Sequence, residues 1–182
     1  MWPLGHVAIG FLAYLAVHRA RNREDIDEIA VLLAVIGSLA PDIIDKPLAW
    51  HLGVLPTGRT LAHSLLVIVP VCLVAYVLAS RSGHPEWGVG LTVGALSHLI
   101  VDALPVLWDP EASGSFLLWP VWSVEEYQDG APTVTALLVE QLGDPYFLIE
   151  FPLFAIAVVC WYRLGMPGVR PLVAAWRSRT RD

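Results

Sequence analysis

Apolar residues run along this chain in long stretches, without the strict alternation that is typical of a β-strand. Five stretches cover about residues 3–19, 28–45, 60–80, 86–107 and 146–166, of which the fourth is interrupted by small residues. Each is near the roughly 20 residues that a helix needs to cross about 30 Å of hydrocarbon. Because lipid offers backbone polar groups no partner, such segments are expected to span as helices. The pattern predicts an all-α fold, a polytopic membrane helix bundle of about five transmembrane helices in one domain.

Composition agrees with a membrane environment. Of the 182 residues, 56% are hydrophobic and only 15% are charged, which is too apolar for an ordinary soluble domain of this length. The formal net charge of -6 argues against a nucleic-acid partner, because the DNA or RNA backbone would be repelled. Membrane lipid is therefore the expected surrounding and the expected partner.

The basic residues indicate an orientation in the membrane. Nine of the eleven Lys and Arg residues follow the first, third or fifth apolar stretch, whereas the loop at about 108–145 has none and carries several acidic residues. The positive-inside rule places the N-terminus outside and the C-terminus inside the cytoplasmic membrane, with 167–182 as a cytoplasmic tail. The stretch 3–19 could instead be a signal peptide, but its positive charges follow the apolar core, so we expect a retained helix. The nine basic residues are Arg19, Arg21, Arg23, Arg81, Arg163, Arg170, Arg177, Arg179 and Arg181.

Imidazole and carboxylate side chains gather at the outer ends of the expected helices. His6 starts the first, Asp42 ends the second, His63 starts the third, and His98 and Asp102 end the fourth. The four-residue spacing of His98 and Asp102 places both on one helical face. Ionisable groups inside a membrane are costly and normally face a bundle interior or a polar cavity. Together the five residues predict a metal site.

Each of these residues also has an ordinary interpretation. His6 can form an interfacial hydrogen bond, Asp42 can end a helix, and Asp102 can orient His98 without binding metal itself. The nitrogen and oxygen donors suit zinc, with manganese or iron as alternatives, and the set is large enough for one or two ions. The remaining imidazoles are expected to be ordinary interfacial residues: His18, His51 and His84.

Further charged residues at the same end suggest how an anionic substrate would be handled. Lys46 and Arg59 are the only basic residues expected outside, each four positions from a proposed ligand, so they can either bind a phosphate or pair with the nearby carboxylates. Asp45 and Glu150 are the expected proton-transfer residues, because each is a carboxylate beside the site without an assigned ligand role. The apolar segment 116–122 is expected to form an interfacial lip or plain membrane packing.

Four sequence blocks resemble the YdjM-type membrane-bound metal-dependent hydrolases. They are GSLAPDIID at 37–45, RTLAHSLL at 59–66, SHLIVD at 97–102 and GSFLLWP at 114–120, in the family's order. The resemblance implies hydrolase activity and functional residues at His6, Asp42, His63, His98 and Asp102. Many relatives have His where this chain has Gly58, which puts one ligand or substrate contact in doubt. The order of His and Asp residues is also distantly similar to zinc-dependent phospholipase C.

These observations lead to the hypothesis of a membrane-embedded metal-dependent hydrolase that cleaves a phosphoester of a lipid or other amphipathic substrate at the outer interface. Two alternatives stay open. One is a metal-ion transporter, against which the cytoplasmic halves of the expected helices offer almost no polar groups. The other is a non-catalytic membrane scaffold that a structural metal staples together.

Overall fold

The computed structural model describes residues 1–21, 25–126, 133–169 and 176 of the chain. Every regular element in these residues is helical, which confirms the predicted all-α class. The elements are α1 (Pro3–Ala20), α2 (Glu28–Trp50), α3 (Leu65–Arg81), α4 (Pro85–Ala103), η1 (Leu104–Leu107), η2 (Ser115–Leu118), α5 (Val134–Gln141), α6 (Pro145–Leu148) and α7 (Glu150–Arg163).

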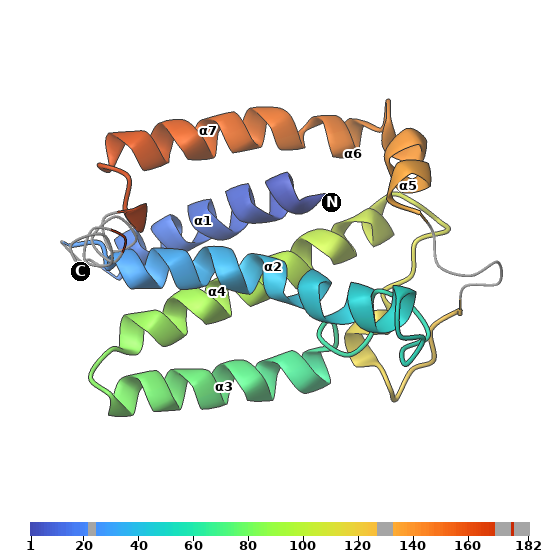
Figure 1. Cartoon of the computed structure of the whole chain (residues 1–182), viewed down its shortest axis with the longest axis horizontal. Coiled ribbons are helices and arrows are strands. Elements are labelled where there is room, and N and C mark those ends of the chain that lie inside the picture. Colours follow the sequence, from blue (N-terminus) through green and yellow to red (C-terminus); the bar gives the residue numbers. More distant parts are fainter. Residues whose placement is uncertain (22–24, 127–132, 170–175, 177–182) are drawn as a thin grey trace.

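The long helices run back and forth along the longest axis of the molecule (Figure 1). Helix α4 is central, because it packs against α1, α2 and α3, while α7 packs against α1. The turn between α3 and α4 and the end of α7 lie at one end of the bundle, here called the basic end. The short elements η1, η2, α5 and α6 lie at the other end, here called the site end.

Local sequence signals set the helix starts. Asp27 precedes α2 and its carboxylate accepts hydrogen bonds from the backbone of Ile29 and Ala30, and the Ser64 hydroxyl accepts one from Leu66 at the start of α3. These caps satisfy amides that the first helical turn leaves without intrahelical partners. Helices α1, α4 and α6 begin at prolines, whose missing N–H is tolerated at that position.

Small residues bring α2 and α4 into backbone contact. A Cβ on Gly94 would lie 2.0 Å from the carbonyl oxygen of Ala34, and one on Gly90 would lie 2.2 Å from that of Ala30. On α2, a Cβ on Gly37 would lie 2.4 Å from the carbonyl oxygen of Leu91. Small residues allow this close approach in membrane bundles, where packing drives helix association. The contact places the carboxyl-terminal turns of α4 directly beside the second half of α2.

Two of the predicted spans begin or end elsewhere. Helix α2 continues past residue 45 to Trp50, and α3 starts at Leu65 because residues 51–64 form an irregular loop. This loop folds around the carboxylate of Asp45, which accepts backbone hydrogen bonds from Thr60 and Ala62. The first residues of the predicted stretch 60–80 therefore belong to a hydrogen-bonded loop, and the helix begins only at Leu65.

Among the described residues, the stretches Pro85–Leu107 and Pro145–Arg163 are long and apolar enough to cross a membrane, and Leu65–Arg81 is a shorter apolar helix. Five crossings remain a prediction. Most of the predicted tail, including its four arginines, lies outside the described residues. The outward side of α3 carries exposed Leu66, Val69, Leu73, Val74 and Leu78, a surface that suits contact with lipid.

Candidate metal centre

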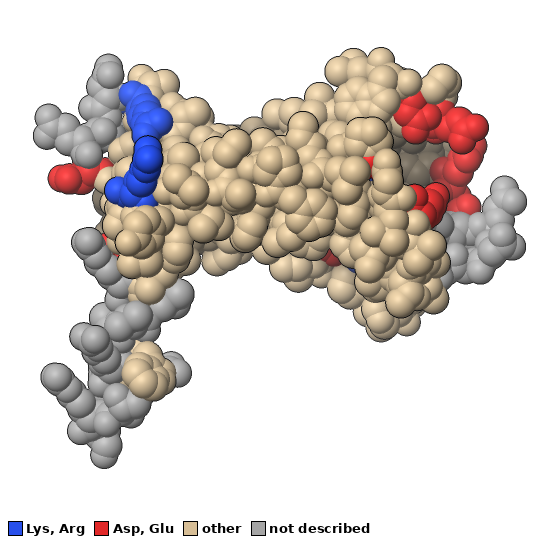
Figure 2. Space-filling model, turned by 90° about the horizontal axis from the view of Figure 1, so that it is seen from above, with Lys and Arg blue, Asp and Glu red and all other residues tan. Residues whose placement is uncertain are grey.

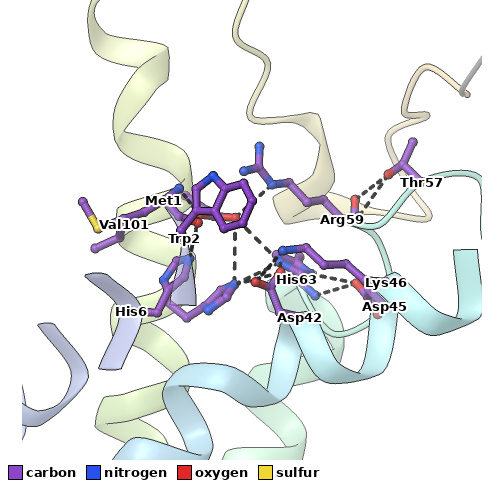
Figure 3. A network of polar contacts seen from close by, with 12 residues as sticks. Met1, Trp2, His6, Asp42, Asp45, Lys46, Thr57, Arg59, His63 and Val101 are labelled. Atoms are coloured by element: carbon purple, nitrogen blue, oxygen red, sulfur yellow. Dashed lines mark hydrogen bonds and ion pairs between the residues drawn. The ribbon is translucent and has the colours of Figure 1, made fainter. Parts of the chain in front are cut away.

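The structure brings the five predicted ligand residues together at the site end. His6 lies in the first turns of α1, Asp42 in the second half of α2, His63 in the loop before α3, and His98 and Asp102 near the end of α4. All five side chains are buried. Figure 3 shows His6 on one side of this group and Asp42 and His63 on the other. Segments far apart in the sequence thus supply one compact polar cluster.

Two imidazole nitrogens lie close together in this cluster, and each has two carboxylate oxygens within 4 Å. His63 Nε2 lies 3.0 Å from His98 Nε2, and Asp42 Oδ1 lies 3.6 Å from His63 Nε2 and 3.8 Å from His98 Nε2. Asp102 Oδ2 lies 3.8 Å and 3.9 Å from the same two nitrogens. A tetrahedral ion with bonds of about 2.0–2.1 Å would have neighbouring ligand atoms roughly 3.3 Å apart. Asp42 Oδ1, His63 Nε2 and His98 Nε2 are therefore spaced closely enough to hold one divalent ion, and Asp102 Oδ2 lies beside the two nitrogens of this group.

Hydrogen bonds orient both imidazoles toward that point. His98 Nδ1 lies 2.7 Å from the Ser38 carbonyl oxygen, which can only accept, so His98 Nδ1 carries the proton. His63 Nδ1 lies 2.8 Å from Asp45 Oδ2. With both Nδ1 atoms serving as donors, the two Nε2 atoms face each other as lone pairs unless a cation or a proton lies between them. Metal-binding histidines are usually fixed in this way by a carbonyl or carboxylate.

The ionisation of His63 fits the same picture. Burial alone would lower the pKa of this loop residue, but the nearby carboxylates of Asp42, Asp45 and Asp102 outweigh burial and raise its pKa. A protonated His63 can donate from Nε2 to His98, which explains their short contact without metal. The proton on His63 Nε2 then lies between the two imidazole rings, where a metal cation would bind.

Two buried atoms of the five ligand side chains, Asp42 Oδ1 and His6 Nδ1, have no hydrogen-bond partner among the described residues. Asp42 Oδ1 is buried without one, whereas Asp42 Oδ2 accepts a 2.6 Å bond from the Lys46 ammonium. An unsatisfied buried carboxylate oxygen is costly, by about 1–3 kcal/mol or more. Its position beside two imidazole nitrogens indicates that a cation would satisfy it.

Asp102 connects this cluster to a second candidate group. Its Oδ1 lies 3.2 Å from His6 Nε2, and its Oδ2 lies 2.9 Å from Arg59 Nε. The His6 and His98 rings are stacked with centroids 3.8 Å apart. Ligand atoms of His6, His98 and Asp102 lie within 4.8 Å of one another, as do those of Asp42, His63 and His98. The two groups share His98, so the described residues can hold one ion, or two closely spaced ions.

Asp45 is fully occupied by hydrogen bonds. Its Oδ2 accepts from the backbone of Thr60 and His63 and from the His63 ring, and its Oδ1 accepts from the backbone of Ala62. These four donors tie the loop to α2 and hold the His63 ring in place. The geometry favours a positioning role, and the proton-transfer role expected from the sequence stays a prediction.

Glu150 lies at the start of α7 with its side chain buried. Its two carboxylate oxygens accept hydrogen bonds from the backbone N–H groups of Trp2 and Gly5. These amides begin α1, so Glu150 caps the helix that carries His6, in the manner of an N-terminal cap from a neighbouring helix. Its expected proton-transfer role also stays a prediction.

The segment that was expected to form a lip covers His63. Phe116 of η2 packs edge-on against the His63 ring with centroids 6.2 Å apart. The Ser64 hydroxyl donates to the carbonyl oxygen of Trp119. The buried Phe116 thus closes one side of the cluster, while Val121 and Trp122 beyond it are exposed. The segment is therefore part packing and part exposed apolar surface.

Sequence reasoning missed two contributors to the site. The Ser38 carbonyl fixes the tautomer of His98, and Gly94 allows α4 to come close enough for that bond. A main-chain acceptor leaves no signature in side-chain chemistry. The small residues in 88–97 are the one available signal, and in the hydrophobic pattern they only interrupt an apolar stretch.

Comparison with known proteins identifies the family. The family model described as YdjM inner membrane protein matches residues 1–166. The chain therefore belongs to this family of inner membrane proteins. No curated protein and no solved structure matches the chain. The distant similarity to zinc-dependent phospholipase C thus stays an analogy.

Proposed function

We propose that this member of the YdjM inner membrane protein family is a metal-dependent hydrolase that cleaves a phosphoester of a lipid or other amphipathic substrate. The observation that carries the proposal is a pair of imidazole nitrogens 3.0 Å apart, each 3.6–3.9 Å from two carboxylate oxygens, beneath a half-exposed arginine. A buried cluster that needs a cation and lies next to an accessible basic group suits binding of an anionic substrate.

The donor set decides which ions fit. His63 and His98 offer nitrogen, and Asp42 and Asp102 offer oxygen, a mixture that suits Zn²⁺ and also Mn²⁺ or Fe²⁺. His6 is available to a second ion that shares the Asp102 carboxylate. A bound ion would supply Lewis acidity toward a phosphoryl oxygen and a nucleophile from water at neutral pH.

The charges of the cluster support an anionic substrate. Three cations, Lys46, Arg59 and the N-terminal ammonium, balance Asp42, Asp45 and Asp102, so a divalent ion would make the site positive. The Arg59 side chain is 48% exposed and bonds Asp102 through Nε, which leaves the outer edge of its guanidinium facing outward (Figure 3). We propose that this edge binds the phosphoryl group and that Lys46 adds positive charge beside Asp42.

The surroundings of the cluster support an amphipathic substrate at a membrane interface. Ile43, Leu52, Val54, Trp108 and Trp122 all belong to site-end segments and are each more than half exposed. Large apolar side chains, with Trp among them, are common where a protein meets the boundary between hydrocarbon and headgroups. A lipid headgroup at this depth could reach Arg59 while its chains remain in the bilayer.

We further propose that the site end faces outward and the basic end faces the cytoplasm. Arg19, Arg21, Arg81 and Arg163 are exposed where α1, α3 and α7 end. Figure 2 shows basic residues gathered at one end of the molecule and most acidic residues at the opposite end. The positive-inside rule assigns the arginine-bearing end to the cytoplasm.

A second candidate function is a scaffold held together by a structural metal. Four protein ligands would fill all tetrahedral positions of a single ion, as structural zinc sites do. Two ions sharing the same residues would each lack a full protein set and keep an open position. Metal stoichiometry therefore discriminates the two functions.

The first experiment measures metal content by elemental mass spectrometry in protein purified in detergent without chelators. Wild type is compared with His98→Ala and with His84→Ala, in which an exposed histidine is replaced. We expect metal in wild type and His84→Ala and its loss in His98→Ala. Full metal content in His98→Ala would refute the ligand assignment.

The activity test follows with the same three proteins in mixed micelles. Release of phosphate or of a phosphorylated headgroup is measured over a panel of lipid phosphoesters. The hydrolase proposal expects turnover in wild type and in His84→Ala that disappears in His98→Ala. One tightly bound ion per chain together with no turnover on the panel would favour the structural-metal scaffold.

A further inference from the structure

Helix α4 is interrupted directly after Asp102. In a continuous α-helix, the Val101 carbonyl would accept a hydrogen bond from the N–H group four positions along the chain, at residue 105. Residue 105 is a proline, which has no N–H and whose ring clashes with the carbonyl four residues earlier. Helix α4 accordingly ends at Ala103, and the chain continues as the 3-10 helix η1. Pro105 thus leaves the Val101 carbonyl without its usual donor.

Tyr146 supplies a donor from a distant segment. Its hydroxyl donates a hydrogen bond to the carbonyl oxygen of Val101. The Leu104 N–H adds only a shared contact, because it also donates to the Ile100 carbonyl. The Val101 carbonyl belongs to the peptide group that joins Val101 to Asp102. The phenol of Tyr146 therefore holds the backbone directly beside Asp102.

The Tyr146 side chain is itself fixed in place. Its backbone N–H donates to Asp144 Oδ1 at the start of α6, at 2.9 Å. The Trp108 ring packs edge-on against the Tyr146 ring, with centroids 5.3 Å apart. The neighbouring Phe147 is buried and packs against Trp2, with centroids 5.9 Å apart. Helix α6 is thus attached both to the end of α4 and to the start of α1.

The carboxylate of Asp102 depends on this attachment. Its Oδ1 lies 3.2 Å from His6 Nε2, and its Oδ2 lies 2.9 Å from Arg59 Nε. Both distances change if the last turn of α4 opens, as helix ends do when few contacts hold them. Asp102 belongs to the group with His6 and His98 that can hold an ion, whereas the other candidate group does not contain it.

We propose that Tyr146 is a positioning residue of the metal centre, which directs the Asp102 carboxylate toward an ion held with His6 and His98. Tyr146 acts through the backbone of α4, because its hydroxyl bonds a main-chain carbonyl. The proposal rests on the proposed function, since it assumes that a metal binds at this site, and it holds for any substrate.

The test compares Tyr146→Phe with Tyr162→Phe in the whole chain, purified in detergent. Phenylalanine keeps the ring that packs against Trp108 and removes only the hydroxyl. Tyr162 lies on α7 and is 70% exposed, so its replacement is the matched control. Co²⁺ is titrated as the probe, and its affinity, stoichiometry and absorption bands are measured. The unfolding temperature is measured separately with chelator.

We expect Tyr146→Phe to bind Co²⁺ about tenfold more weakly than wild type, at the lower end of the range for groups that orient a metal ligand. The absorption bands should also shift, because they report the arrangement of the ligands. If two ions bind, only one should be weakened, since Asp102 belongs to one of the two groups. Tyr162→Phe should match wild type.

Two results would overturn the proposal. One is wild-type affinity and wild-type bands in Tyr146→Phe. The other is an equal loss at both ions together with a lower unfolding temperature in chelator, because that combination indicates general destabilisation.

A second substitution tests whether the effect passes through the Val101 carbonyl. Pro105→Ala returns an N–H group at the position that donates to this carbonyl in an α-helix. We expect Pro105→Ala to restore at least part of the Co²⁺ affinity that Tyr146→Phe loses. No restoration would refute the role of the Val101 carbonyl.

These measurements separate the inference from the proposed function, because none of them depends on turnover. Weaker Co²⁺ binding in Tyr146→Phe, together with no phosphoester turnover in wild type, would refute the proposed function and keep Tyr146 as a positioning residue. Turnover in wild type, together with unchanged Co²⁺ binding in Tyr146→Phe, would refute only the inference. A wild-type protein that binds no Co²⁺ would refute both.

Discussion

Replacing Asp45 by Asn tests whether this carboxylate positions His63. Asp45 is 0% exposed and accepts four hydrogen bonds, three of them at Oδ2. An asparagine would turn its single oxygen toward the three donors and point its NH₂ group at the Ala62 amide. Two donors then face each other in a buried place, and the Thr60 and His63 bonds lose their charge assistance.

The magnitude follows from this count. One buried amide left without an acceptor costs about 1–3 kcal/mol. Loss of the carboxylate behind the His63 ring should weaken metal binding by about 10–100-fold. Unfolding is measured by circular dichroism in detergent with chelator, and metal affinity by competition with a chromophoric chelator. Glu125→Gln, an exposed carboxylate in a site-end segment, is the matched control and should change neither quantity.

The same variant separates positioning from proton transfer. If Asp45 only positions His63, turnover on a phosphoester substrate should recover when Asp45→Asn is saturated with metal. A variant that is fully loaded yet inactive would support the proton-transfer prediction. Wild-type stability together with a metal dissociation constant within about twofold of wild type would refute the reasoning from the hydrogen bonds.

Three further predictions concern other parts of the site. Gly94→Ala should lower the free energy of unfolding by about 1–3 kcal/mol in denaturant titrations, because its Cβ would lie 2.0 Å from the Ala34 carbonyl oxygen. The control Gly114→Ala should leave the free energy of unfolding unchanged, because its Cβ would have no atom nearer than 3.8 Å. Arg59→Gln should leave metal content unchanged and weaken phosphate inhibition of turnover at least about tenfold, and equal inhibition would remove Arg59 from the substrate site. Because the pKa of His63 is raised, its protonation stabilises the metal-free protein, and this stabilisation is fully present below the ordinary pKa of about 6.5. The stabilisation should be lost as pH rises through the raised pKa of His63. Metal affinity should increase over the same pH range, because the metal binds the deprotonated imidazole. Unfolding and metal titrations between about pH 5 and 9 check both signs.

The close α2–α4 contact explains why the sequence predicts at which end of the bundle the ligand residues lie, but not which of their atoms face one another. Apolar length alone placed His6, Asp42, His63, His98 and Asp102 at one end of the bundle. Which atoms would face one another depended on the glycines of α4 and on the Ser38 carbonyl, and these act through backbone shape. The sequence alone does not show whether small residues interrupt a helix or allow two helices to pack closely.

The conformation of the loop 51–64 depends on a contact with a residue outside the loop, so local sequence patterns do not predict it. Leu61 and Ala62 continue the apolar pattern of α3, so the stretch predicted from the sequence starts at residue 60 and includes His63. In the structure, the backbone N–H groups of Thr60 and Ala62 donate hydrogen bonds to the carboxylate of Asp45, which is distant in the sequence. In a helix, these N–H groups would donate to backbone carbonyls one turn earlier. The carboxylates of Asp45 and Glu150 also accept hydrogen bonds from backbone amides that are distant in the sequence, and these contacts are recognised only when the tertiary structure is known.

The sequence by itself determined the all-helical class, the family and the set of residues that meet at the site end, because apolar length and ionisable residues in apolar segments are local properties. Only the tertiary structure decided which nitrogen of each imidazole faces the centre, which carboxylates are already engaged, that Tyr146 donates to the Val101 carbonyl, and that His18 is buried instead of interfacial. Those features arise where helices distant in sequence approach within hydrogen-bond distance, and no single segment contains the information that specifies them.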